Sequence, residues 1–111
     1  MTLDSNALRV MVADFKGTTE DVKWGGDLCF CVGAKMYLVY GMGSGGFSFK
    51  STPDEFARLT QRPGWSPAAY VARYHWVSVA ADAEVDPAEM KDLVAESYRL
   101  VVAGLPKKLR P

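Results

Sequence analysis

Three short segments with β-strand character follow one another between residues 28 and 50, and they limit the possible folds more than any other feature. Leu28–Val32 and Lys35–Tyr40 are rich in apolar, aromatic and β-branched residues, which favours strands. Phe47–Lys50 alternates apolar and polar residues, as a strand with one buried face does. The two-residue link Gly33-Ala34 predicts a hairpin turn of type II′ and therefore antiparallel pairing.

Helix signals flank these strands. Thr52-Pro53-Asp54-Glu55 and Asp86-Pro87-Ala88-Glu89 each combine a capping side chain, a proline at the first helical position and an acid in the first turn. The second signal begins a long helix that runs to Gly104, with apolar residues spaced by three and four. A shorter helix is expected over residues 4–14, and Gly17–Asp21 is expected to form a loop.

Two further strands are predicted at Ala68–Ala72 and His75–Ala80. The resulting order, α-β-β-β-α-β-β-α, predicts an α+β fold in which an antiparallel sheet packs against helices. The 111 residues contain no repeat or linker, so a single domain is expected over 1–111.

The charges balance overall but are unevenly distributed. The chain has 13 basic and 13 acidic residues, which argues against strong, sequence-independent binding of nucleic acid. Residues 35–76, however, hold five basic residues and only two acidic ones, and the tail after Gly104 holds three basic residues and no acid. Both a positive face and a mixed, solvated surface are compatible with this pattern.

The sequence shows no catalytic constellation. Gly41–Gly46 matches G-x-G-x-x-G, but it leads into a strand, so we interpret it as a mobile hairpin loop and not as a nucleotide site. Cys29, Cys31 and the single histidine, His75, are too few for a zinc site, and the two thiols suit a reducing cytosol as small buried residues. We expect no enzyme activity, no cofactor and no metal. We also expect a cytoplasmic chain, because no apolar run is long enough to cross a membrane.

One feature points to a partner. The strand Lys35–Tyr40 is apolar on both faces, so a second sheet face around Tyr37, Val39 and Trp76 is left for a further contact. A homodimer, a protein partner or a small molecule could occupy it. The aromatic residues between positions 70 and 76 are usually core, and the alternative is a partly exposed stacking surface.

A series of short motifs runs from about Leu8 to Lys108. It comprises Thr19–Gly25, Leu28–Phe30, Val32–Met36, Phe49-Lys50, Thr52–Glu55, Pro67–Tyr70, His75–Val77, Ser97–Val102 and Leu105–Lys108. In this order and spacing the motifs resemble the MmcQ/YjbR family of small bacterial proteins. The resemblance implies a compact α+β fold whose antiparallel sheet is similar to frataxin-like and secretion-chaperone-like folds.

Members of that family are commonly labelled DNA-binding, from a double-wing arrangement of hairpins. The resemblance thus implies a non-enzymatic module of the bacterial cytoplasm that binds double-stranded DNA, with the hairpin at Gly33-Ala34 and the loop at 41–46 as wings. The residues expected to contact DNA are Lys35, Lys50, Arg73, His75, Trp76, Lys107 and Lys108. The alternatives are a chaperone-like, dimerising interaction module and a small-molecule (drug) binder.

Overall fold

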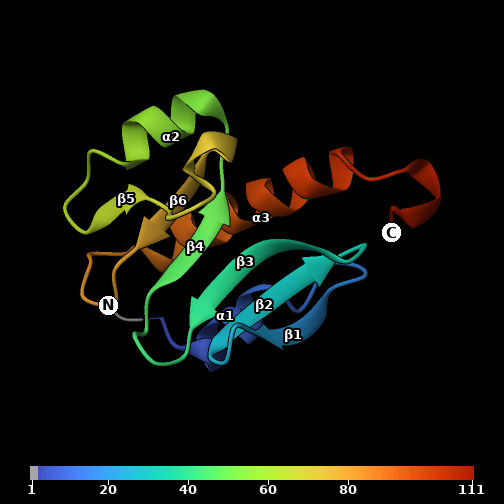
Figure 1. Ribbon diagram of the computed structural model, residues 1–111, viewed down its shortest axis with the longest axis horizontal. Coiled ribbons are helices and arrows are strands. Elements are labelled where there is room, and N and C mark those ends of the chain that lie inside the picture. The colour runs from blue at the N-terminus through green and yellow to red at the C-terminus, as the bar shows by residue number, and fades with distance from the viewer. Residues whose placement is uncertain (1–2) are drawn as a thin grey trace.

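The fold is an open antiparallel sheet of six strands with three α-helices (Figure 1). The computed structural model describes residues 3–111, so residues 1 and 2 of the expected domain lie outside it. The α-helices are α1 (Ser5–Met11), α2 (Pro53–Leu59) and α3 (Pro87–Ala103), and the short 3₁₀ helices are η1 (Ala72–Tyr74) and η2 (Lys107–Leu109). The strands are β1 (Thr19–Lys23), β2 (Asp27–Val32), β3 (Lys35–Gly41), β4 (Phe47–Lys50), β5 (Trp65–Pro67) and β6 (Trp76–Val79). They lie in the order β1-β2-β3-β4-β6-β5, which confirms the α+β class.

The core lies between one face of the sheet and the helices. Figure 1 shows α1 and α3 behind the sheet, and α3 packs on β2, β3 and β4. Leu38, Phe49 and Val77 are cross-strand neighbours on this face, and all three are buried. The next row of neighbours, Val39-Ser48-Ser78, therefore points to the opposite, open face. These three side chains are small and partly exposed.

The predicted helix starts are confirmed by their caps. The Asp4 carboxylate accepts a hydrogen bond from the backbone N–H of Ala7 at 2.8 Å. The Thr52 hydroxyl accepts one from the N–H of Glu55 at 3.2 Å. These bonds satisfy backbone donors that the first helical turn leaves without a partner. Asp86 plays the same part at the start of α3.

The hairpin between β2 and β3 is confirmed, but its predicted turn type is wrong. Both turn residues have positive φ, 55° at Gly33 and 66° at Ala34, which defines type I′ and not type II′. Glycine adopts this conformation readily, whereas the Cβ of Ala34 makes it strained. A Cβ at Gly33 would also meet Leu105 Cδ1 at 2.6 Å, so the tip of the hairpin rests directly on the chain that follows α3.

The loop expected at Gly17–Asp21 is wrong in its second part, where the edge strand β1 begins. Thr19–Lys23 contains one apolar residue, Val22, so it lacks the alternation that reveals a half-buried strand. Its side chains are mostly exposed, and its backbone pairs only with β2. The strand is specified by this ladder and not by burial.

The strand predicted at Ala68–Ala72 is also wrong. The strand β5 ends at Pro67, and after one more backbone hydrogen bond, from the Ala68 N–H to the Trp76 carbonyl at 3.0 Å, the chain leaves the sheet. Tyr70 has a φ of 69°, and the chain then forms η1. His75, predicted to start the next strand, is left-handed as well, so β6 begins one residue later at Trp76.

Candidate functional site

The sheet opens where β3 and β4 separate. Their ladder ends at the pair Leu38–Phe49, and the next pair would join Tyr37 to Lys50. Ser97 of α3 takes the place of that pair: its hydroxyl accepts from the Lys50 N–H at 2.9 Å and donates to the Tyr37 carbonyl at 2.6 Å. Because this hydroxyl stands between the strands, they diverge, and α3 passes behind the opening (Figure 1).

A bulge in β3 accompanies the separation. Phe30 pairs with Leu38 and Cys31 pairs with Met36, which leaves Tyr37 as an extra residue. Its ring points into the core, where it contacts Tyr98 edge to face, and its hydroxyl shares a hydrogen bond with Thr18. Burial raises the pKa of Tyr37 to about 12.

A cleft of about 320 Å³ lies at this opening. Lys35 stands at the start of β3, Lys50 at the end of β4 and Trp76 at the start of β6, so the strand ends bring three residues from distant parts of the chain together. Tyr74 of η1 contributes an aromatic ring that is 48% exposed. The remaining walls come from Met36, Leu100, Val101, Gly104 and Leu105.

The cleft is cationic and has apolar walls. No carboxylate lines it. Within residues 3–111 the four ion pairs all use arginines, at positions 9, 58, 62 and 99, so the ammonium groups of Lys35 and Lys50 are not engaged by carboxylates. Two such groups over apolar walls suit a ligand that combines negative charge with a flat or apolar body.

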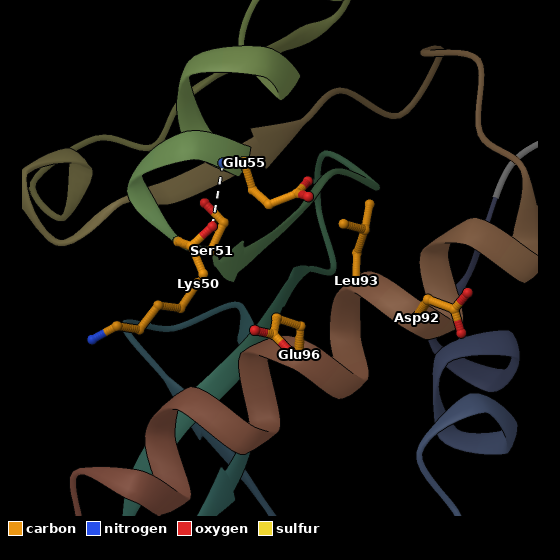
Figure 2. A pocket seen from close by; sticks show the side chains of 7 residues that line it. Lys50, Ser51, Glu55, Asp92, Leu93 and Glu96 are labelled. Carbon is orange, nitrogen blue, oxygen red and sulfur yellow. Dashed lines mark hydrogen bonds between the residues drawn. The ribbon is translucent and has the colours of Figure 1, made fainter.

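Lys50 also borders a second, acidic hollow, which Figure 2 shows from close by. Glu55, Asp92 and Glu96 line it, and the Lys50 side chain extends away from them. Arg58 pairs with Glu55, and Arg99 pairs with Glu96. Lys50 lines the cleft as well, so it stands between the acidic hollow and the cleft.

Of the residues predicted to contact DNA, Lys35, Lys50 and Trp76 come together in the cleft, although Trp76 is largely buried. The Arg73 guanidinium lies over the Tyr74 ring at 4.8 Å, which places Arg73 beside the cleft wall. Lys107 and Lys108 belong to η2, are exposed, and follow the wall residue Leu105 without lining the cleft.

His75 has a structural position outside the cleft. Its left-handed backbone directs the ring toward α2, where it packs edge to face on Phe56 with ring centroids 5.6 Å apart. Its carbonyl accepts hydrogen bonds from both the N–H and the hydroxyl of Ser51. The residue therefore fastens the start of β6 to the segment before α2.

The surface predicted around Tyr37, Val39 and Trp76 is not one continuous face. Tyr37 is buried on the helix side because of the bulge, whereas Val39 lies on the open face. Cys29 and Cys31 are free and buried, as predicted, and burial raises the pKa of both thiols.

The two expected wings lie at opposite ends of β3. The hairpin tip Gly33-Ala34 precedes the strand and the loop 41–46 follows it, so seven residues, or roughly 20 Å, separate them. The loop instead contacts the β1–β2 hairpin, since the Met42 N–H binds the Gly26 carbonyl at 2.9 Å. It connects antiparallel strands, as its interpretation as a hairpin loop predicts.

Sequence reasoning missed Ser97 and did not name Tyr74 among the site residues. A signal for Ser97 exists: it lies three residues after Val94 and seven after Met90, on the buried stripe of α3. A buried hydroxyl at such a position needs a hydrogen-bond partner, so it indicates that a nearby backbone group lacks one from the sheet.

Within residues 3–111 the helices include none with the length and apolar character needed to cross a membrane.

These features define a small α+β protein with one open antiparallel sheet, in which a helix residue replaces the last pair between two neighbouring strands. A family model described as YjbR matches residues 13–100, and the chain belongs to this family. It is 31% identical over 83 residues to the uncharacterized protein YbdF of Escherichia coli O157:H7, covering 71% of this chain and 67% of that protein. The family resemblance of the sequence motifs is thus confirmed.

Solved structures support the same fold. The Deinococcus radiodurans protein DR2400, with a DUF419 domain, superposes with a TM-score of 0.86 at 25% identity, over 98% of this chain and 86% of that one. A protein from Pseudomonas syringae superposes with a TM-score of 0.70 at 18% identity, over 87% of this chain and 97% of that one.

Proposed function

We propose that the chain is a non-enzymatic nucleic-acid-binding module that acts in the bacterial cytoplasm. The observation that carries this proposal is the convergence of Lys35 and Lys50 on one cleft with no carboxylate in its lining. Arg73 extends the cationic surface from the cleft wall, and the exposed residues Lys107 and Lys108 follow the wall residue Leu105. The proteins to which the chain is similar come from bacteria.

The cleft lining supports a binding role in preference to catalysis. Among residues 3–111 no carboxylate, imidazole, thiol or serine hydroxyl lines the cleft, so it lacks the Ser–His, Cys–His and carboxylate pairs that commonly carry acyl transfer and hydrolysis. Two ammonium groups above apolar walls are suited to holding an anionic ligand.

The affinity for duplex DNA should depend strongly on salt. Three to five phosphate contacts, from Lys35, Lys50 and Arg73 alone or together with Lys107 and Lys108, predict a fall of about 40- to 500-fold between 50 and 200 mM salt. The chain's net charge is zero, so this dependence would come from the local cluster and not from the molecule as a whole.

A titration of labelled DNA with a charge-matched control tests the proposal. The double variant K35Q/K50Q should lower the affinity at 50 mM salt by about tenfold or more and reduce the salt slope by about 2. The control K23Q/K91Q removes the same charge, with Lys23 at the other end of the sheet and Lys91 in the first turns of α3. Equal losses in both double variants, or an affinity that ignores salt, would contradict the proposal.

A small anionic molecule is the second candidate, because the volume of the cleft lies at the lower end of the range of ligand pockets. A thermal-shift screen of aromatic carboxylates and nucleotides would detect it. A carboxylate that stabilises the native chain but not K35Q/K50Q, in the absence of nucleic-acid binding, would favour this candidate.

A further inference from the structure

From the shape of the cleft we infer that its ligand is single-stranded nucleic acid: one unpaired base enters between the walls while the adjoining phosphates bind Lys35 and Lys50. This inference rests on the proposed function and specifies its substrate class. It differs from the expectation of duplex binding that the family resemblance implies.

The walls of the cleft suit a base, whereas the rim suits phosphate. Met36, Val101 and the small exposed part of Trp76 line the inside, and within residues 3–111 the two lysines are the only charged residues in the lining. A base within a duplex is covered on both faces by its neighbours, so only an unstacked base can reach such an interior. The phosphates on either side of that nucleotide would remain at the cationic rim.

Aromatic rings beside the cleft add surface for stacking. Tyr74 is half exposed, and Arg73 lies over its ring, which places a cation next to a face on which a base can stack. Tyr70 lies four residues before Tyr74 in the chain and does not line the cleft; it is 98% exposed and has a φ of 69°. A bulky residue with this backbone conformation is strained, and such strain is concentrated at functional positions.

The geometry does not provide the paired cationic protrusions that a double-wing contact with duplex DNA would use. A double-wing clamp needs two protruding cationic elements on one side of the DNA. Here the hairpin tip at Gly33-Ala34 and the loop 41–46 are separated by the length of β3, and the loop has no basic residue. The cationic side chains instead gather around a concave site, which favours a flexible strand over a rigid helix.

The experiment compares a labelled 12-nucleotide oligothymidine with a 12-base-pair duplex at 50 mM salt. We expect the single strand to bind at least tenfold more tightly. Stacking on an aromatic ring predicts that Y74L weakens the single strand by about 5- to 150-fold, that Y74F restores it, and that neither change affects the duplex to that extent. The control W24N removes an exposed ring at the other end of the sheet and should have no effect.

A spectroscopic readout on the chain with its cleft intact accompanies the titration. In W24N the remaining tryptophans are Trp65, which is buried in the core, and Trp76 in the cleft wall. Oligothymidine should quench the fluorescence of this variant, and the duplex should not.

The outcomes separate the inference from the function on which it rests. Equal affinity for the two oligonucleotides, or an unchanged affinity in Y74L without quenching, would overturn the inference and leave nucleic-acid binding standing. Failure of both oligonucleotides to bind at 50 mM salt would overturn both.

Discussion

Replacing Ser97 with alanine should destabilise the chain far more than the loss of one small hydroxyl suggests. That hydroxyl satisfies the N–H of Lys50 and the carbonyl of Tyr37, and the Ser97 side chain is fully buried. Each buried backbone group left without a partner costs about 1–3 kcal/mol. Alanine favours the helix by about 0.5 kcal/mol, so the expected loss in the free energy of unfolding is about 2–5 kcal/mol.

Urea denaturation followed by fluorescence measures this loss, and amide exchange locates it. The Lys50 amide should exchange slowly in the native chain and rapidly in S97A, because only the serine hydroxyl protects it. The control S66A, on the exposed edge strand β5, should change stability by no more than about 0.5 kcal/mol. A loss below that value in S97A, with the Lys50 amide still protected, would refute the reasoning.

Three further predictions concern stability. A34G should raise the urea midpoint, by about 0.5–1 kcal/mol in free energy, because glycine relieves a φ of 66°; a lower midpoint would contradict this. Burial raises the Tyr37 pKa to about 12, above its ordinary value near 10, so the neutral form of Tyr37 is favoured in the folded chain. This contribution is complete below pH 10 and is lost as pH rises through 12, so the free energy of unfolding should fall less steeply over that range in Y37F than in the native chain; an equal decline would contradict this. The bidentate bond from Arg62 lowers the pKa of Glu89, so E89Q should cost roughly 1 kcal/mol or less at pH 7. The difference from the native chain should begin to shrink as pH falls below the ordinary carboxyl pKa and vanish below the lowered pKa of Glu89; a difference that persists there would show that charge is not its source.

Much of the fold could be predicted because apolar residues recur along the sequence with the period of a half-buried strand or helix. Phe47 and Phe49 alternate with polar residues, and the caps at Thr52 and Asp86 are local signals. The strand β1 has no such apolar pattern, because an edge strand with exposed side chains is held by backbone hydrogen bonds to its neighbour. The bulge at Tyr37 could not be predicted either, because one extra residue changes the face of an apolar side chain without changing its type.

The candidate site was predictable in its charges but not in its shape. Lys35 and Lys50 follow from strand ends, which hairpin connections bring together. His75 appeared equivalent to Trp76, but its left-handed backbone directs its ring to α2. The opening of the sheet depends on a contact between Ser97 and Tyr37, 60 positions apart, which no local pattern contains.

That long-range contact determines when the cleft can exist during protein synthesis. Its lysines belong to β3 and β4, but the wall residues from Leu100 to Leu105 and the hydroxyl that separates the strands are translated much later. A nascent chain that has emerged only as far as β6 can pair its hairpins, yet it has no binding site. Under the proposed function, ligand would bind only chains whose last α-helix has docked, and by mass action it would stabilise only those.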